Sequence, residues 1–139
     1  MSIDYGALKT EINSDPLALG YAGKTDLQVS EILNTVATDN LNAGRRIIRS
    51  SVGAGEIMAC ITRADFAALT ANDKSYLQLI ASCGSIDPGN ANIVAAFGAM
   101  FSGQSLTNLS NVRYRPASRA ETLFGERVEV WDVARARAL

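Results

Sequence analysis

The sequence predicts a mainly α-helical protein, folded as a single compact domain of six or seven short helices with at most two short strands. Three observations carry this prediction. Apolar residues recur at helical spacing, Ser, Thr or Asp residues stand where helix caps are expected, and Gly or Pro interrupts the pattern at short intervals. The 139 residues match one typical domain. Without repeats or a long linker, residues 1–139 are expected to form one domain.

The first expected helix covers residues 3–14, because Tyr5, Leu8 and Ile12 fall on one helical face. Asp15-Pro16 should end it, since the residue before proline is pushed away from helical backbone angles. Thr25 and Gln28 form a capping box that opens the second helix. The apolar stripe of this second helix consists of Val29, Ile32, Leu33 and Val36.

Residues 39–44 are rich in Asp, Asn and Gly, which favour turns. The segment from Arg46 to Val52 concentrates β-branched residues and predicts a short strand, which Gly53 and Gly55 break. Residues 56–61 are expected to form at least one helical turn.

Two further caps are predicted in the middle of the chain. Thr62 with Asp65 opens one short helix, in which Ile61 and Phe66 have the spacing of a hydrophobic staple. Thr70, with Asp73 three residues on, opens a longer one. The stripe of this longer helix consists of Tyr76, Leu77, Ile80 and Cys83, and Gly84 suits its end.

Asp87-Pro88 predicts the next helix start, with a cap followed by proline at the first helical position. Gly103 should end that helix, and residues 107–114 are expected to form another short one. The residues expected to be buried from the helix after Pro88 are Ile93, Val94, Phe97, Met100 and Phe101.

The last part of the chain begins after Pro116. Ser118 and Glu121 form a capping box for a helix that runs to Phe124. Residues 128–131 alternate in polarity, which predicts an extended piece. Asp132 should then cap a final helix through Leu139.

Composition narrows the class of function. Apolar residues make up 47% of the chain, and charged residues only 19%, which indicates that a partner covers part of the surface. The net charge of −1 gives no general attraction to nucleic acid or to anionic membranes. Neither a membrane-spanning apolar run nor the pattern of a signal peptide is present, so we expect synthesis in a cytoplasm.

The sequence contains no histidine, the commonest general base and metal ligand. Gly53-Ala54-Gly55 is a lone glycine pair without the rest of a phosphate loop, and Ser82-Cys83-Gly84-Ser85 lacks a residue to activate its hydroxyl or thiol. We therefore expect no enzyme activity, with no catalytic residues, no cofactor and no metal. Cys60 and Cys83 are expected to be small buried residues, with a disulfide or a thiol contact between subunits as the alternative.

Carboxylate pairs are the remaining source of acid–base chemistry. Asp65 and Asp73 are expected in the first turns of helices, where a negative charge interacts favourably with the helix dipole. Glu126 and Glu129 lie near Arg127 in a segment that is expected to be exposed to solvent. These simpler explanations disfavour a catalytic role for either pair.

Arginine is concentrated at the C-terminal end. Residues 113–139 hold six Arg and four acidic residues, whereas residues 1–112 hold seven Lys or Arg and ten acidic residues. Arginine and aromatic side chains are enriched in protein interfaces. We predict a partner interface that consists of Arg113, Tyr114, Arg115, Arg119, Phe124, Arg127, Trp131, Arg135 and Arg137.

Two alternatives remain for this C-terminal segment. It could be a solvated helix face with local ion pairs, or it could contact DNA. A second basic cluster, Arg45, Arg46 and Arg49, is better explained as protection of a strand edge than as a nucleic-acid patch.

Three stretches of the sequence form recognisable motifs. They are DPLALGYAGKTD at 15–26 with Val29 and Leu33-Asn34, FAALT at 66–70, and SRAETLFG at 118–125 with Val128 and DVARA at 132–136. Together these motifs resemble a family of small proteins that tailed bacteriophages and prophages encode near their virion structural genes. The resemblance covers most of the chain in order and is weakest over residues 41–60.

This resemblance implies a structural role in the virion. Size and helicity are similar to those of head–tail adaptor or connector proteins, which assemble in rings. The expected partners are further copies of the chain and the portal or tail proteins. The alternatives are a minor tail or fibre-attachment protein, and a helical module inside the host cell that binds protein or DNA.

Overall fold

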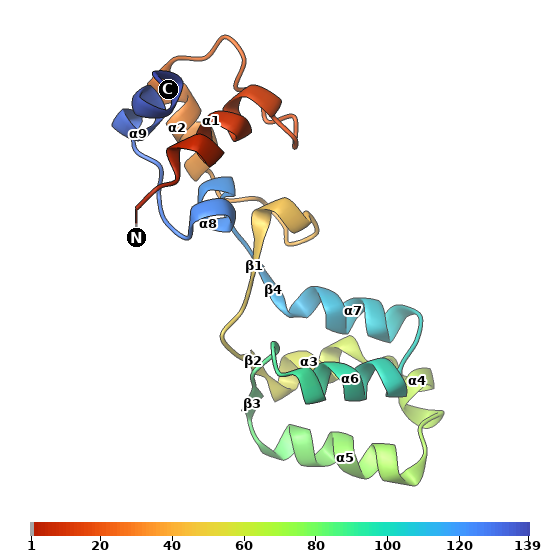
Figure 1. Ribbon diagram of the computed structural model, residues 1–139. Coiled ribbons are helices and arrows are strands. Elements are labelled where there is room, and N and C mark those ends of the chain that lie inside the picture. Colours follow the sequence, from red (N-terminus) through yellow and green to blue (C-terminus); the bar gives the residue numbers. More distant parts are fainter. Residues whose placement is uncertain (1) are drawn as a thin grey trace. The chain divides into compact units, whose positions relative to one another are not determined.

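The computed structural model describes residues 2–139 and confirms the mainly helical class (Figure 1). Its described residues contain nine α-helices, one 3₁₀ turn and four short strands, more elements than the sequence predicts. Contacts divide the chain into two compact units. Unit 1 comprises residues 1–46 and 116–139, and unit 2 comprises residues 47–115.

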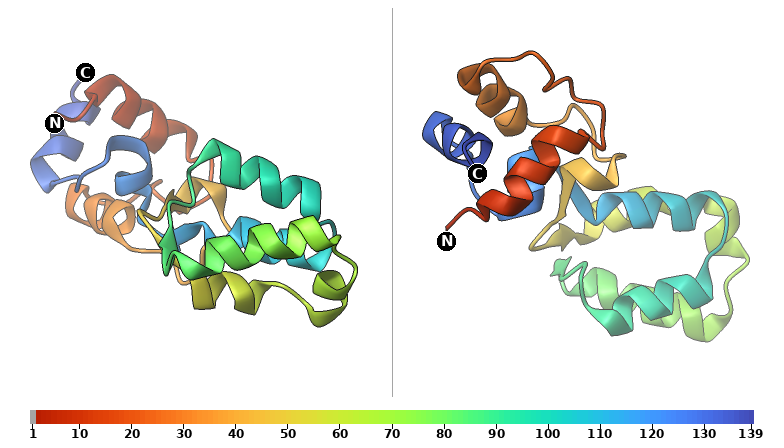
Figure 2. Two further views of the ribbon diagram at one scale, coloured as in Figure 1. Left: turned by 90° about the horizontal axis from the view of Figure 1, so that it is seen from below. Right: turned by 45° about the horizontal axis from the view of Figure 1, so that its top comes forward.

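Unit 1 contains the helices α1 (Tyr5–Ser14), α2 (Asp26–Asn34), α8 (Arg119–Phe124) and α9 (Val130–Arg137), with the 3₁₀ turn η1 (Ala43–Arg45). Helix α9 packs on both α1 and α2, so the first and last helices lie side by side in each view (Figures 1 and 2). Leu8, Val29, Leu33, Val128 and Val133 are fully buried and form the centre of the core.

Unit 2 contains five helices and a two-stranded antiparallel ribbon. The helices are α3 (Ala54–Cys60), α4 (Arg63–Ala67), α5 (Ala71–Ser82), α6 (Ala91–Met100) and α7 (Gln104–Val112). Strand β2 (Val52–Gly53) pairs with β3 (Ser85–Ile86), with Val52 opposite Ile86. Helix α3 contacts both α5 and α7. The core of this unit is separate and includes Ile57, Leu77, Phe97 and Leu109.

The two places where the chain passes between units lie in paired strands. Strand β1 (Arg46–Ile48) is the neighbour of β4 (Tyr114–Pro116) in a two-stranded sheet. The amide of Ala117 donates to the carbonyl of Arg45 at 2.9 Å, and the amide of Arg49 donates to that of Arg113 at 2.8 Å. The pairing of β1 with β4 therefore holds the two ends of the segment that forms unit 2 next to each other.

Four predicted helix caps are confirmed. The side chains of Thr25, Thr62, Thr70 and Ser118 each accept a hydrogen bond from the backbone amide three residues on, and Thr25 and Gln28 complete the expected capping box. Such a cap satisfies an amide that otherwise lacks a partner in the first helical turn. Gly84, with a φ of 79°, also follows α5 as expected.

Two predicted helix starts are wrong. Asp87 accepts a hydrogen bond from the amide of Gly89 and forms a turn, while Asn90 caps α6. Asp132 lies inside α9 instead of capping it, and its carboxylate accepts the amide of Glu129 at 2.9 Å. The same side chains that cap helices also stabilise turns, which explains the wrong assignment of these two caps. Residues 128–131 are not an extended piece either, because α9 already begins at Val130.

Other boundaries also differ from the prediction. The strand expected over 46–52 is two strands in two different sheets, and the helix expected over 107–114 begins at Gln104, ends at Val112 and is followed by β4. Helix α2 ends at Asn34, so Val36 does not belong to its stripe and is exposed. These boundaries depend on the pairing of β1 with β4 and of β2 with β3. Local periodicity in the sequence does not predict which distant segments pair.

Several expected core positions are also corrected. Val94 is exposed, and Ile93 and Met100 are only partly buried, whereas Phe97 and Phe101 are buried as expected. Tyr76 lies on the exposed face of α5, because Leu77 and Ile80 take the inward positions, and Cys83 is exposed at the C-cap that follows the helix. Cys60 is buried and Cys83 exposed, and both are free thiols.

The loop after α1 has two non-glycine residues in the left-handed region, Asp15 with φ 44° and Ala18 with φ 53°. The Asp15 carboxylate accepts the amides of Leu19 at 2.7 Å and Gly20 at 2.8 Å. Burial raises the pKa of Asp15, but these amide hydrogen bonds lower it more, so that its pKa lies below the usual value. The carboxylate thus holds the loop in its strained conformation.

We expect Ala18→Gly to raise the free energy of unfolding by about 0.5–1 kcal/mol, because glycine removes the steric cost of the left-handed backbone. Ala134 is also exposed but lies within α9, so Ala134→Gly should lower the same quantity by about 0.5–1 kcal/mol. Chemical denaturation of both variants measures the two effects. Destabilisation by both would contradict the role assigned to the backbone at Ala18.

An ion pair on unit 2 gives a pH dependence. The Arg49 guanidinium donates to both oxygens of Glu56 at 2.8 Å, and the amide of Gly53 donates to Oε2 at 3.0 Å. The Arg49 hydrogen bonds first, and the Gly53 amide second, lower the pKa of Glu56 to about 2 from its ordinary 4.5. The folded state therefore holds this carboxylate ionised where the unfolded chain takes up a proton.

The stabilisation from Glu56 is expected to be complete above pH 4.5 and to disappear as the pH falls toward 2. Unfolding of the chain by urea at a series of pH values measures it. Arg49→Gln should flatten the profile in this window, and added salt should reduce the effect because the pair is partly exposed. An unchanged profile in Arg49→Gln would contradict the assignment.

Candidate partner-binding surfaces

The structure divides the predicted interface between the two units. Arg113, Tyr114 and Arg115 belong to unit 2, and the remaining six residues belong to unit 1. The segment 113–139 is therefore not a single element. It comprises the end of one unit, the strand β4, and the helices α8 and α9 of the other.

Arg119 is part of a buried polar cluster. Its guanidinium donates to the two carboxylate oxygens of Glu11 at 2.8 and 3.1 Å and to the carbonyl of Gly44 at 3.1 Å. The side chains of Arg119 and Glu11 are only 11% and 4% exposed. The hydroxyl of Tyr21 also donates to Glu11 at 2.8 Å. These contacts tie α1, α8 and the loop before α2 together, so the function visible for Arg119 is internal.

The electrostatics of this cluster favour the charged pair. The Glu11 hydrogen bonds raise the pKa of Arg119 above its usual value. Burial, and then the hydrogen bond to Glu11, raise the pKa of Tyr21 well above its usual range. Tyr21 therefore donates to Glu11 as a neutral hydroxyl. The sequence patterns did not predict this cluster of Glu11, Tyr21 and Arg119.

Helix α9 presents two different faces. Asp132, Val133 and Ala136 point into unit 1, and the hydroxyl of Tyr5 donates to Asp132 at 2.9 Å. This hydrogen bond is the main reason that the pKa of Tyr5 lies above its usual value. The guanidinium of Arg135 lies 4.8 Å from the centre of the Tyr5 ring. Arg137 closes the helix end, donating to Asp26 at 2.6 Å.

The opposite face of α9 is exposed and carries the only tryptophan of the sequence. The side chain of Trp131 is 68% exposed, and Ala134 and Ala138 follow it at positions i+3 and i+7. We call Trp131, Ala134 and Ala138 the α9 face. Phe124, by contrast, packs partly buried against the core of unit 1, and Arg127 is exposed in the loop before α9, 3.5 Å from Glu129.

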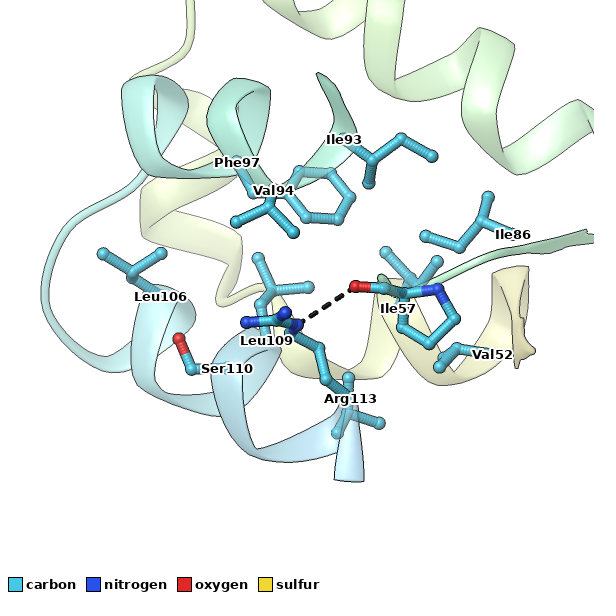
Figure 3. A pocket seen from close by; sticks show the side chains of 12 residues that line it. Val52, Ile57, Ile86, Ile93, Val94, Phe97, Leu106, Leu109, Ser110 and Arg113 are labelled. Carbon is cyan, nitrogen blue, oxygen red and sulfur yellow. Dashed lines mark hydrogen bonds between the residues drawn. The ribbon is translucent and has the colours of Figure 1, made fainter. Parts of the chain in front are cut away.

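Unit 2 contains a small apolar pocket, shown in Figure 3. Ile57, Ile93, Phe97 and Leu109 from three helices line it, and its volume is about 40 Å³. The polar side chains in its lining are those of Ser110 and Arg113. Arg113 Nε donates to the carbonyl of Pro88 at 3.0 Å, the bond drawn as a dashed line. One predicted interface residue thus belongs to a concave site.

Unit 2 also holds a polar cluster formed by Thr62, Asp65 and Ser105. Ser105 donates to Asp65, and the amide of Thr62 donates to Ser105 at 3.0 Å, which joins the starts of α4 and α7. The hydrogen bonds from Ser105 and Thr62 lower the pKa of Asp65.

Residues 2–139 include no cluster of three potential metal ligands. No helix in that range is long and apolar enough to cross a membrane.

Comparison of the chain with protein-family models, with curated proteins and with solved structures gives no match.

Proposed function

We propose that the protein is a structural subunit of a tailed-phage virion, most specifically a head–tail connector or adaptor subunit that assembles into a ring with further copies and contacts portal or tail proteins. The exposure of Trp131 on α9 is the observation that carries the assembly role. A tryptophan buries a large apolar area when covered and is enriched at the energetic centres of protein interfaces. The sequence resemblance to phage structural-region proteins supports the placement in a virion.

The internal contacts of the arginines favour a protein partner over DNA. Arg119 and Arg137 are paired with Glu11 and Asp26 inside unit 1. A pair of this kind cancels the positive charge that attracts phosphate groups. Stacking of Arg135 on Tyr5 holds a further guanidinium against the unit.

Mass spectrometry of purified virions, with peptide abundance scaled to the portal protein, tests this proposal. A copy number close to that of the portal is the expected result. A few copies set by the tail tip would support a minor tail or fibre-attachment protein instead. Absence of the chain from the particle would overturn the virion role and favour a binding module in the host cell.

Trp131→Ala is expected to weaken assembly by about 2 kcal/mol, or roughly 30-fold, if the α9 face is the centre of an interface. Folding should be nearly unchanged because the side chain is exposed. Analytical ultracentrifugation of the purified chain measures the change. Leu79→Ala, at a position 63% exposed on α5 of unit 2, is the matched control. Equal effects of both variants would contradict a specific role for Trp131.

A further inference from the structure

We propose that the pocket of unit 2 binds one leucine-sized side chain of a partner protein, presented by an acidic peptide segment whose carboxylate pairs with Arg113. The inference deepens the proposed function, on which it rests only for the identification of the partner as another virion protein. It is carried by the size, the lining and the charge of the pocket.

The size of the pocket selects the kind of ligand. Small-molecule and cofactor sites enclose roughly 300–1,000 Å³, whereas this pocket has about 40 Å³. That volume holds roughly three groups of the size of water or methyl. The branched end of a single aliphatic side chain is of this size, and a cofactor or nucleotide is far too large.

The lining selects an apolar group. Val52, Ile57, Ile86, Phe97 and Leu109 line the interior. The labelled side chains in Figure 3 come from β2, α3, β3, α6 and α7, with Arg113 directly after the end of α7. A water molecule needs at least two polar partners to be held in such a cavity. Because few are present, an aliphatic side chain gains more than water does from filling the pocket.

Val94 places the entrance of the pocket at the surface. Val94 lines the pocket, and 37% of this residue is nevertheless exposed. Ser110, another lining residue, is also exposed. An incoming side chain therefore reaches the apolar interior between α6 and α7 without unfolding of the unit.

Arg113 gives the site its charge preference. Its Nε is held by the carbonyl of Pro88 at 3.0 Å, and its guanidinium carbon lies 5.5 Å from the centre of the Tyr114 ring. These contacts hold a positive charge beside an apolar lining that carries no acidic side chain. A carboxylate flanking the inserted side chain complements this charge, and an ammonium group is repelled by it.

Nuclear magnetic resonance of the full ¹⁵N-labelled chain tests the proposal with three short blocked peptides. Acetyl-Asp-Leu-Glu-amide should shift the amide signals of Val94, Leu106 and Leu109. The glycine analogue, acetyl-Asp-Gly-Glu-amide, should leave them in place. The basic analogue, acetyl-Lys-Leu-Lys-amide, should bind at least about fivefold more weakly, as expected when an exposed ion pair is replaced by repulsion.

Two variants make the test specific. Val94→Trp should fill the entrance and abolish the shifts of Leu106 and Leu109, and Arg113→Glu should reverse the preference between the acidic and the basic peptide. Leu79→Glu, on the exposed face of α5 outside the pocket, should change nothing. If Arg113→Glu does not fold by circular dichroism, Val94→Trp still decides whether the pocket is the site.

Several results would overturn the inference. These are equal binding of the leucine and glycine peptides, no preference between acidic and basic peptides, and unchanged binding in Val94→Trp. Concentration-dependent shifts of the same amides without peptide would assign the pocket to a second copy instead of a different protein. A chain present in virions that binds none of the peptides refutes this inference alone, and a chain that binds them but is absent from virions refutes the proposed function alone.

Discussion

Glu11→Ala should lower the free energy of unfolding of unit 1 by about 3–5 kcal/mol, because it leaves the buried guanidinium of Arg119 without its counter-ion. For a unit of about 70 residues the melting temperature should fall by roughly 12–40 °C. Glu11 also accepts the hydroxyl of Tyr21, so the variant leaves a second buried donor unpaired. Thermal and urea unfolding, followed by circular dichroism, measure the loss.

The controls separate this buried pair from surface charge. Arg137→Ala breaks the partly exposed pair with Asp26 and should cost less than about 1 kcal/mol. The double variant Glu11→Leu with Arg119→Met should recover much of the loss, because an apolar pair needs no counter-ion. A loss in Glu11→Ala no greater than in Arg137→Ala would contradict the structural role of the cluster.

Leu77→Ala should lower the free energy of unfolding of unit 2 by about 2–5 kcal/mol and leave that of unit 1 unchanged. Leu77 lies on α5 with 1% of its side chain exposed, within the core that includes Ile57 and Phe97. Native-state hydrogen exchange resolves the two units. Protection should fall in α3, α5 and α7, while the amides of α1, α2 and α9 keep theirs.

Leu79 gives the matched control for this prediction, two residues along the same helix but 63% exposed. Leu79→Ala should change stability by less than about 0.5 kcal/mol. Equal loss of protection in both units of Leu77→Ala would mean that the two cores unfold as one cooperative system, contrary to their separation in the structure.

Local signals in the sequence predicted the local structure well. Thr25, Thr62, Thr70 and Ser118 were recognised as caps because a cap is decided by residues within three positions of each other. The mainly helical class followed from the same signals and from the apolar stripes. The caps assigned to Asp87 and Asp132 failed, because an aspartate followed by a turn and an aspartate inside a capping box look alike without the backbone path.

Long-range contacts were beyond the reach of these signals. The pairing of β1 with β4 joins residues more than 60 positions apart, and the expected single strand over 46–52 could not reveal it. The two cores are likewise defined by which helices meet. A sequence stripe states that one face of a helix is buried but does not state against which partner.

The candidate interface illustrates the same limit. Arg119 and Trp131 have equal weight in a composition argument, but the structure buries one beside Glu11 and exposes the other on α9. The contact with Glu11 spans 108 positions, so no nearby residue announces it. The sequence drew attention to Arg113 through its charge, and only the fold brought it beside the apolar side chains of the pocket.

The pairing of β1 with β4 also bears on the order in which the chain folds. Unit 1 is built from two segments separated by about 70 residues, and joining the ends of a loose loop of that length costs roughly 4 kcal/mol in entropy. Unit 2 is continuous, so it forms from contacts nearer in sequence, which generally form faster. When unit 2 has folded, β1 lies beside β4. The entropy cost of closing the long loop then no longer opposes the formation of unit 1. We therefore expect unit 2 to fold first and to bring the two segments of unit 1 together, so that slowing the formation of unit 2 should delay the assembly of α1 and α2 with α9.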